Sequence, residues 1–508
     1  MPRGYDVLAL GYAALSVLVL LWDVLLAGQI ARARRQSRLF LALTAICGLF
    51  VVPAALIVVA SNSMLTGRAI HLVAWIWPVT LGVFVAQSGY ALARRLVTPL
   101  FAVPIFALNV LLFAAAVVRY TGEFVPDLPS FLLGVEGAQA SALGLLFGRA
   151  ALASPLLLVL PLLSPAFRAR WRVTKSVRAL LAIAASAVVT LTLMEYPRAV
   201  HAAQTFSDML EERLQERPKD DLLLGVRILP AVTSAPPPAA LARDLALTDT
   251  LDIGAVSVTV LPRGVTAFAL DSLALTLDNL RRDSVLIVVS LGYGRADGDL
   301  YRRSPSEYLT RRLQIVDRVV RRLRPDVLLP ALDPSAAGAE VLGRVPLEWW
   351  QSYLTRASAL THRVRPRTRV GLAASTFSVE DSALYAWGER SDAIDVLGFS
   401  IATSFGGGAS LVARHRVAAR WMQRSRKPQW VFSARAFPRT FGEANQARAI
   451  WATLAWATRQ SQVRGVIVDG AGDYETLVGL RAPSGRLRPA VAMVDRVRRA
   501  LAEAAEAR

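Results

Sequence analysis

Long apolar runs dominate the first two hundred residues. Five of them approach the ~20 residues that a helix needs to cross about 30 Å of hydrocarbon, and they cover residues 6–28, 39–60, 70–92, 97–118 and 177–195. A sixth run, residues 150–167, contains three prolines, which membrane spans tolerate when neighbouring helices satisfy the freed carbonyls. The pattern predicts a transmembrane helical domain of about six helices over residues 1–195.

The loops between these runs alternate in basic content. The first, third and fifth loops hold clusters of Arg and Lys, whereas the second holds only Arg68 and the fourth is mainly acidic. Because Lys and Arg mark cytoplasmic loops, both termini are expected outside the cytoplasm. The predicted localisation is the cytoplasmic (inner) membrane, multi-pass, with the lipid bilayer as a partner and the C-terminal domain on the extracytoplasmic side.

The pattern changes after residue 195. Residues 196–220 read as a charged connector, and from residue 221 short runs rich in Val, Ile and Leu alternate with helical patterns. Alternating strands and helices predict a parallel sheet, and near-continuous apolar strands predict burial on both faces. The strands are expected at residues 222–230, 254–262, 284–294, 326–334, 369–375, 395–404, 429–438 and 464–474. The clearest helices are expected at residues 266–282, 307–324, 347–363, 409–424, 443–460 and 487–505.

Eight strand–helix units have the count and size of a (β/α)8 TIM-type barrel, here over residues 221–508. An open doubly wound sheet is the alternative. No strand is followed by G-x-G-x-x-G or by G-x-x-x-x-G-K-[ST], the loops that cradle nucleotide phosphates. The sequence therefore predicts no nucleotide cofactor.

Composition and charge refine this picture. The chain has 508 residues, of which 54% are hydrophobic and 19% charged, with a formal net charge of +20. The basic residues of the N-terminal part fall in loops, and those of the C-terminal part are scattered. The sequence has no stripe of basic residues interleaved with aromatic ones, so nucleic-acid binding is not predicted. Cys47 is the only cysteine, which excludes a disulfide or a cysteine-based metal site within one chain.

The candidate chemistry lies at the C-terminal ends of the predicted strands, where barrel active sites are found. None of the four histidines falls there, so neither a His-based metal site nor a Ser-His-Asp triad is expected. Carboxylates, aromatic rings and hydroxyls suit sugar binding and glycoside hydrolysis. The catalytic candidates are Asp333, Asp469 and Asp473, and the binding candidates are Tyr293, Thr403, Phe405, Ser433, Arg435, Phe437 and Tyr474.

Structural roles compete with these assignments. Asp333 stands in Leu-Asp-Pro-Ser, a sequence that also suits a turn or a helix cap. Asp469 and Asp473 flank Gly470 and Gly472, so they could equally shape a loop. The residue types alone leave both interpretations open.

The last five units resemble the (β/α)8 glycoside hydrolases of the large retaining clan that includes cellulases and β-galactosidases. RPDVLLPALDP (324–334) resembles their fourth strand, which ends in an Asn-Glu-Pro acid–base motif. KPQWVFSARAFP (427–438) resembles their seventh strand, in which Lys-Pro precedes an apolar run and the nucleophile Glu. VRGVIVDGAGDYETLVGLRAPSGRLRPA (463–490) resembles their last strand and tail. The resemblance covers residues 320–500 and implies the same barrel.

Two departures from that family bear on its chemistry. Asp333 stands at the acid–base position with Leu332 in place of the Asn, and the nucleophile position falls on Ser433. No Asp or Glu lies between Lys427 and Phe441. The resemblance thus implies a barrel that lacks one carboxylate of the family's mechanism.

Three functions follow as hypotheses. The first is a membrane-anchored, extracytoplasmic, glycoside-hydrolase-like barrel that binds cell-surface or exported glycan and is catalytically degenerate. The second is an active, inverting glycosidase that uses Asp333 with Asp469 or Asp473. The third is an accessory subunit of a transport or polysaccharide-export system. The sequence indicates no particular protein partner.

Overall fold

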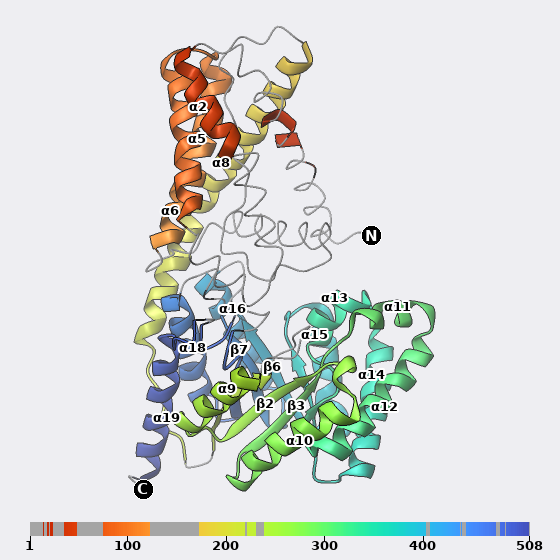
Figure 1. Ribbon diagram of the computed structural model, residues 1–508. Coiled ribbons are helices and arrows are strands. Elements are labelled where there is room, and N and C mark those ends of the chain that lie inside the picture. Colours follow the sequence, from red (N-terminus) through yellow and green to blue (C-terminus); the bar gives the residue numbers. More distant parts are fainter. Residues whose placement is uncertain are drawn as a thin grey trace. The chain divides into compact units, whose positions relative to one another are not determined.

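The computed structural model describes residues 14, 18–19, 21–23, 35–47, 75–121, 172–218, 221–229, 238–402, 407–436, 438, 443–473, 478–482 and 484–506 (Figure 1). The chain divides into two compact units. The first comprises Met1–Thr205 with Phe405–Gly407 and Phe437–Asn445, and the second comprises Phe206–Ser404, Gly408–Ala436 and Gln446–Arg508. The first is helical where described, and the second contains a barrel.

Two packed helices, α5 (Ile76–Ala93) and α6 (Pro99–Thr121), form the best-defined part of the first unit, beside α2 (Arg35–Ile46) and with α8 (Arg172–Asp208) following (Figure 1). Gly89 on α5 faces Phe106 on α6, and a Cβ at Gly89 would lie 3.2 Å from that ring. The side chain of Asn109 donates a hydrogen bond to Ser88 Oγ over 3.3 Å. The interface therefore combines small residues with a buried polar pair.

The prediction of a six-span membrane domain is wrong. Among the described residues, no helix is both long and apolar enough to cross a membrane. The same finding contradicts the multi-pass inner-membrane localisation with the barrel on the extracytoplasmic side, and it gives no support to the lipid bilayer as a partner.

The error lies in equating apolar runs with spanning helices. Among the described residues, α2 extends over 12 residues and α8 over 37, from Arg172 into the charged connector. Most of the runs at residues 6–28 and 39–60 lies outside the described residues. The run at residues 150–167 lies outside the described residues.

Eight parallel strands close into a barrel in sequence order, β1 to β8, so the barrel part of the fold prediction is confirmed and the doubly wound alternative is wrong. Seven of the predicted apolar runs contain one strand each, and the eighth strand begins one residue before its run, at Val463. The strands are β1 (Leu223–Leu229), β2 (Ala255–Val260), β3 (Leu286–Leu291), β4 (Val327–Leu329), β5 (Arg369–Ala374), β6 (Val396–Ala402), β7 (Gln429–Arg435) and β8 (Val463–Val468).

Helices surround the barrel (Figure 1). Their starts follow capping rules, since Thr266, Ser304 and Ser378 each accept a hydrogen bond from the backbone amide three residues further on. The helices of this part of the chain are α9 (Pro238–Thr250), α10 (Ala267–Arg282), α11 (Arg295–Arg303), α12 (Pro305–Leu323), α13 (Ala339–Leu342), α14 (Leu347–Val364), α15 (Val379–Arg390), α16 (Gly407–Met422), α18 (Glu443–Thr458) and α19 (Ala490–Glu506).

Two aromatic rings fill the lower interior of the barrel. Trp430 and Phe432 on β7 belong to a buried cluster with apolar residues of the other strands. Glycines on the neighbouring strands make room, because a Cβ at Gly465 would lie 2.4 Å from the Trp430 ring and one at Gly398 2.7 Å from Phe432. The interior is therefore packed, and chemistry is confined to the ends of the strands.

A β-bulge on β7 changes which side chains face the interior. Phe399 pairs with Val431 and Ser400 with Ser433, so one extra residue, Phe432, stands on β7 between these pairs. The pairing with β8 also shifts at this point. Bulges re-aim side chains and occur beside active sites. Here the bulge follows the apolar layer and brings Ser433 and Arg435 to the polar end of the barrel.

Candidate ligand-binding site at the mouth of the barrel

The interior positions become polar towards the C-terminal ends of the strands. On β2, Ala255 belongs to the interior cluster, and because side chains alternate along a strand, Ser257 faces the same side. Other polar residues of this layer come from β1, β6, β7 and the segments after β4 and β8. They are Arg227, Ser400, Ser433, Arg435, Asp333 and Asp469.

Asp469 directly follows β8 and lies at the centre of this layer. Its Oδ1 is 3.0 Å from Arg227 Nη1, and its Oδ2 accepts a hydrogen bond of 2.8 Å from Ser433 Oγ. Arg435 Nη1 lies 3.6 Å from the same Oδ2. Two cations and a hydroxyl thus offset the cost of burying this carboxylate.

Asp333 lies opposite, in the turn after β4. Its Oδ1 accepts a hydrogen bond of 2.5 Å from Ser400 Oγ, and its Oδ2 is 3.3 Å from Arg435 Nη2. The backbone has φ 43°, in the left-handed region, which Asp tolerates better than most residues. A π-helical turn, Pro334–Gly338 (η5), follows, and the Gly338 amide donates to the Asp333 carbonyl over 3.1 Å. Asp333 therefore both starts the turn and joins the polar layer.

Arg435 connects the two carboxylates. Its two terminal nitrogens reach Asp333 and Asp469 respectively, and its side chain is 27% exposed, whereas both carboxylates are only 4% exposed. Arg227 is buried and fixed from three sides, since Nε donates to Ser257 Oγ and Nη2 to the Phe432 carbonyl over 3.0 Å. The mouth therefore holds two guanidinium groups and two carboxylates in alternating order, and the charge that solvent meets first is Arg435.

A third guanidinium, that of Arg414, stands beside Arg435. Arg414 on α16 donates to the carbonyl of Ala402 over 2.7 Å, and Ala402 is the strand-register partner of Arg435. The Arg414 guanidinium also lies 5.8 Å from the centre of the Phe377 ring. Burial and the neighbouring Arg435 lower the pKa of Arg414. This arginine and ring were not among the sequence candidates.

Tyr293, a predicted binding residue, lies behind the Asp333 turn. A Cβ at Gly338 would come within 2.9 Å of its hydroxyl, and within the described part of the chain that hydroxyl has no hydrogen-bond partner. Arg312 stacks 5.0 Å from the ring centre. Burial raises the pKa of Tyr293 well above its ordinary value, so the phenol is neutral and can only donate or accept a hydrogen bond.

Asp473, the third predicted catalytic residue, is held in a separate ion pair. Arg488 binds it with both terminal nitrogens, at 2.8 and 2.6 Å, and the Gly479 amide donates to Oδ1 over 2.8 Å. The side chains of this pair are 0–1% exposed. These contacts support a role in shaping the segment after β8 rather than in binding a ligand.

Four other candidates lie outside the described residues, namely Thr403, Phe405, Phe437 and Tyr474. The structure brings Asp333, Asp469, Ser433 and Arg435 together. Arg227 and Ser400 complete the network but were missed. The signal for Arg227 was present in the sequence, because a charged residue interrupts the apolar run LLLGVRILP.

Among the described residues, no three His, Cys, Asp or Glu side chains gather as metal ligands. His362 is hydrogen-bonded to Asp395 over 3.0 Å, just before β6. His415 is buried against Trp456. Neither histidine lies in the polar layer.

No protein-family model and no curated protein matches the chain. Solved structures do. Several of the solved structures that match the chain are glycoside hydrolases, the class that the sequence resemblance names.

Three of these structures illustrate the likeness. A β-glucuronidase of an uncultured Clostridium species is 13% identical over 55% of this chain, with a TM-score of 0.42, and this chain spans 50% of its length. A GH5_18 protein from Bifidobacterium longum is 10% identical over 55% of this chain and 78% of its own, with a TM-score of 0.45. Xylanase 10B from Thermotoga maritima is 11% identical over 57% of this chain and 97% of its own, with a TM-score of 0.41. At these identities and TM-scores the likeness carries no argument about activity or ligand.

Proposed function

We propose that the mouth of the barrel binds carbohydrate and that it does not carry out the retaining reaction of the glycosidase clan it resembles in sequence. The observation that supports this proposal is the Asp333–Arg435–Asp469 arrangement. It presents a cation, two carboxylates and hydroxyl groups at the end of a packed barrel. Such groups can form hydrogen bonds with the hydroxyls of a sugar. The nucleophile position of the family is occupied by Ser433 and therefore has no carboxylate.

Nucleophilic attack by Ser433 is disfavoured by its surroundings. A serine hydroxyl is a weak nucleophile unless an adjacent base takes its proton. Among the described residues, the base in contact with Ser433 is Asp469, and that carboxylate is already paired with Arg227 and Arg435. Both of its oxygens are thus already engaged, Oδ1 by Arg227 and Oδ2 by Ser433 and Arg435.

General acid catalysis by Asp333 is disfavoured for a related reason. A general acid has to carry a proton to the leaving oxygen. Asp333 is in an ion pair with Arg435, and its other oxygen accepts a hydrogen bond from Ser400. Both oxygens act as acceptors in this arrangement, which favours binding over hydrolysis.

Inverting hydrolysis by Asp333 and Asp469 is the second candidate. An inverting enzyme needs two carboxyl groups ~6.5–9.5 Å apart, with a water between one of them and the sugar. The Arg435 guanidinium lies between the carboxylates of Asp333 and Asp469 and contacts both. A ligand that displaced Arg435 would therefore lie between these two carboxylates. This pair serves the alternative better than Asp333 with Asp473, because Asp473 is held by Arg488.

A binding titration tests the proposal. The full chain is titrated by calorimetry with a panel of neutral and acidic oligosaccharides, alongside Asp333→Asn. We expect the variant to bind at least tenfold more weakly, which corresponds to about 1.4 kcal/mol. Asp299→Asn is the matched control, since Asp299 is exposed and pairs with Arg302 on α11. Equal binding by all three proteins, or no binding to any sugar, would contradict the proposal.

A covalent trap tests the mechanism separately. A fluoro-sugar inactivator forms a glycosyl adduct with a retaining nucleophile, and we expect mass spectrometry of the full chain to show no adduct. If hydrolysis is found instead, NMR of the first-formed anomer decides between the alternatives. Inversion that is lost in Asp333→Asn would favour the second candidate, and an adduct on any residue would refute our account of the mechanism.

A further inference from the structure

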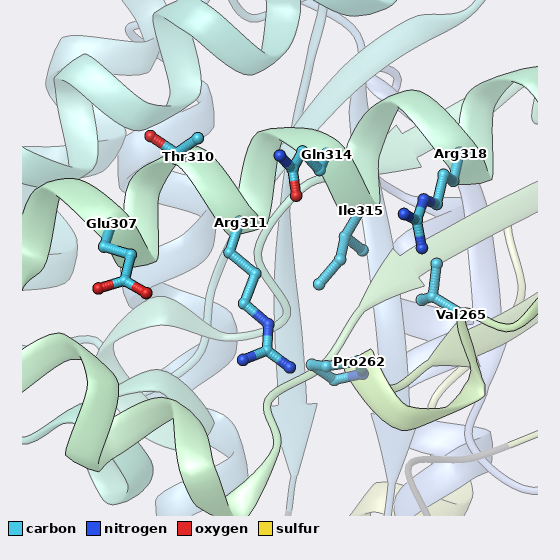
Figure 2. A pocket seen from close by; sticks show the side chains of 8 residues that line it. All are labelled: Pro262, Val265, Glu307, Thr310, Arg311, Gln314, Ile315 and Arg318. Atoms are coloured by element: carbon cyan, nitrogen blue, oxygen red, sulfur yellow. The ribbon is translucent and has the colours of Figure 1, made fainter.

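A groove of about 400 Å³ lies outside the ring of strands, between α12 and the loop from β2 to α10 (Figure 2). Its apolar floor includes Val265 of the loop and Ile315 of α12, both largely buried. Pro262, two residues beyond the end of β2, lines its edge. The groove is thus at the same end of β2 as the polar layer but belongs to the outer wall.

One face of α12 supplies the polar side of this groove. Glu307, Arg311, Gln314 and Arg318 recur at intervals of three or four residues, the spacing that places side chains on one face of a helix. All four are exposed. The groove therefore presents two guanidinium groups, one amide and one carboxylate over an apolar floor.

The two groove arginines differ from their neighbours on α12 in having no partner. Arg321 pairs with Asp317 and Arg322 with Asp271. Within the part of the chain that the structure describes, neither Arg311 nor Arg318 forms an ion pair or a side-chain hydrogen bond. Their charges are therefore available to a ligand, opposed in the groove only by Glu307.

The geometry favours an extended ligand over a small anion. Figure 2 shows both guanidinium groups pointing from α12 towards the loop, one on each side of Ile315. The two arginines are seven residues apart, a rise of about 10 Å along a helix. Two anionic groups on one chain-like molecule fit this spacing, whereas one phosphate or sulfate ion reaches a single arginine.

We propose that this groove binds an acidic oligosaccharide. Carboxylates of two sugar units pair with Arg311 and Arg318, which is the bidentate recognition that guanidinium groups favour. Hydroxyls of the sugar bind the Gln314 amide and the Glu307 carboxylate, and an apolar sugar face covers Pro262 and Ile315. The site stands apart from Asp333 and Asp469, so the inference does not rest on what the mouth of the barrel binds.

A charge-matched comparison tests the groove. The full chain is titrated with oligogalacturonate, with the methyl ester of the same oligomer and with inorganic phosphate. For oligogalacturonate we expect Arg311→Ala/Arg318→Ala to lower the affinity at least tenfold. Arg321→Ala/Arg322→Ala removes the same charge from the same helix outside the groove and should change it less than twofold. Asp299→Asn, which alters an exposed carboxylate on α11, should retain the groove affinity.

The other possible outcomes would each contradict the proposed site. Equal losses in the two arginine pairs would show that the basic chain attracts polyanions without a site. Binding of the methyl ester as tight as that of the acid would remove the role of charge. Phosphate that competes at this site, or oligogalacturonate that fails to bind, would overturn the acidic oligosaccharide as ligand. Thermal unfolding of each variant verifies that the barrel remains folded.

Discussion

Arg227 and Arg435 both pair with Asp469, but they differ in exposure. The Arg227 side chain is 4% exposed and that of Arg435 is 27% exposed. Removing one partner of a buried ion pair leaves an uncompensated charge and costs about 3–5 kcal/mol, whereas solvent reduces that cost at an exposed partner. The two arginines should therefore differ in their effect on stability.

We expect Arg227→Met to lower the free energy of unfolding by about 3 kcal/mol or more, because Asp469, Ser257 and the Phe432 carbonyl all lose a donor. Arg435→Met should cost clearly less and act mainly on ligand binding. Urea unfolding of both variants measures the difference. A loss for Arg435→Met as large as that for Arg227→Met would contradict this division of roles.

His415 is a buried group that titrates far from its ordinary range. Burial, with a contribution from Arg459, lowers its pKa to about 3. The ring stacks on Trp456 with centroids 4.7 Å apart, and Nε2 lies 3.3 Å from Thr453 Oγ1. Thr453 donates its own proton to the Ala449 carbonyl, so its oxygen accepts from a neutral histidine. The native state therefore holds His415 unprotonated.

This burial makes stability depend on pH. Below about pH 6.5 the unfolded chain protonates His415 while the native state does not, so stability falls as the pH is lowered from about 6.5 towards 3. The slope from this residue is about 1.4 kcal/mol per pH unit. His415→Phe keeps a ring against Trp456 and should lack this component when unfolding is measured between pH 6.5 and 4.5. Parallel pH profiles of variant and parent would refute the assignment.

At the scale of elements, the lysine two residues before β7 has a structural role separate from that of the bulge. Lys427 precedes β7, and its ammonium donates to the carbonyls of Gly388, Ser391 and Ile394 at 2.8, 2.6 and 2.5 Å. These carbonyls lie at and after the end of α15. Burial lowers the pKa of Lys427. The Lys-Pro pair of the seventh strand thus joins α15, β6 and β7.

We predict that Lys427→Met destabilises the barrel by about 1–3 kcal/mol, the cost of leaving buried carbonyls without donors. Arg426→Met is the matched control, since Arg426 is exposed and should change stability by less than about 0.5 kcal/mol. Thermal or urea unfolding compares the two. Similar behaviour of both variants would mean that the three hydrogen bonds contribute little.

The elements that the sequence predicted well are those with a strong pattern. Apolar runs located all eight strands, because strands buried on both faces have few alternatives. The sequence could not reveal the bulge at Phe432, which depends on how β7 pairs with two neighbours. It also could not separate Asp469 from Asp473, since the pairing with Arg488 depends on the path of the chain after β8.

For the whole molecule, the main lesson concerns the N-terminal part. Composition there matched membrane spans, yet no helix among the described residues is both long and apolar enough to cross a membrane. The barrel was predictable because the alternation of apolar strands and helices extends over eight units. Its mouth was predictable in position but not in charge balance, which depends on Arg227 and Arg435 from two distant strands.

The division of the chain has a consequence for folding. The barrel has a large apolar core of its own, and domains with their own core can fold alone. We expect residues 206–508, expressed separately, to unfold in one cooperative thermal transition followed by circular dichroism. A fragment that remains in solution without such a transition would show that the barrel needs the preceding helices.

The central claim concerns the ligand that binds at the mouth of the barrel. A crystal structure of the full chain, determined from crystals soaked with an oligosaccharide, tests this claim most directly. Our account predicts a sugar ring hydrogen-bonded to Asp333, Arg435 or Asp469, with its anomeric carbon not joined to the protein. A sugar bound only elsewhere, or a covalent bond from the anomeric carbon to a residue of the mouth, would contradict it.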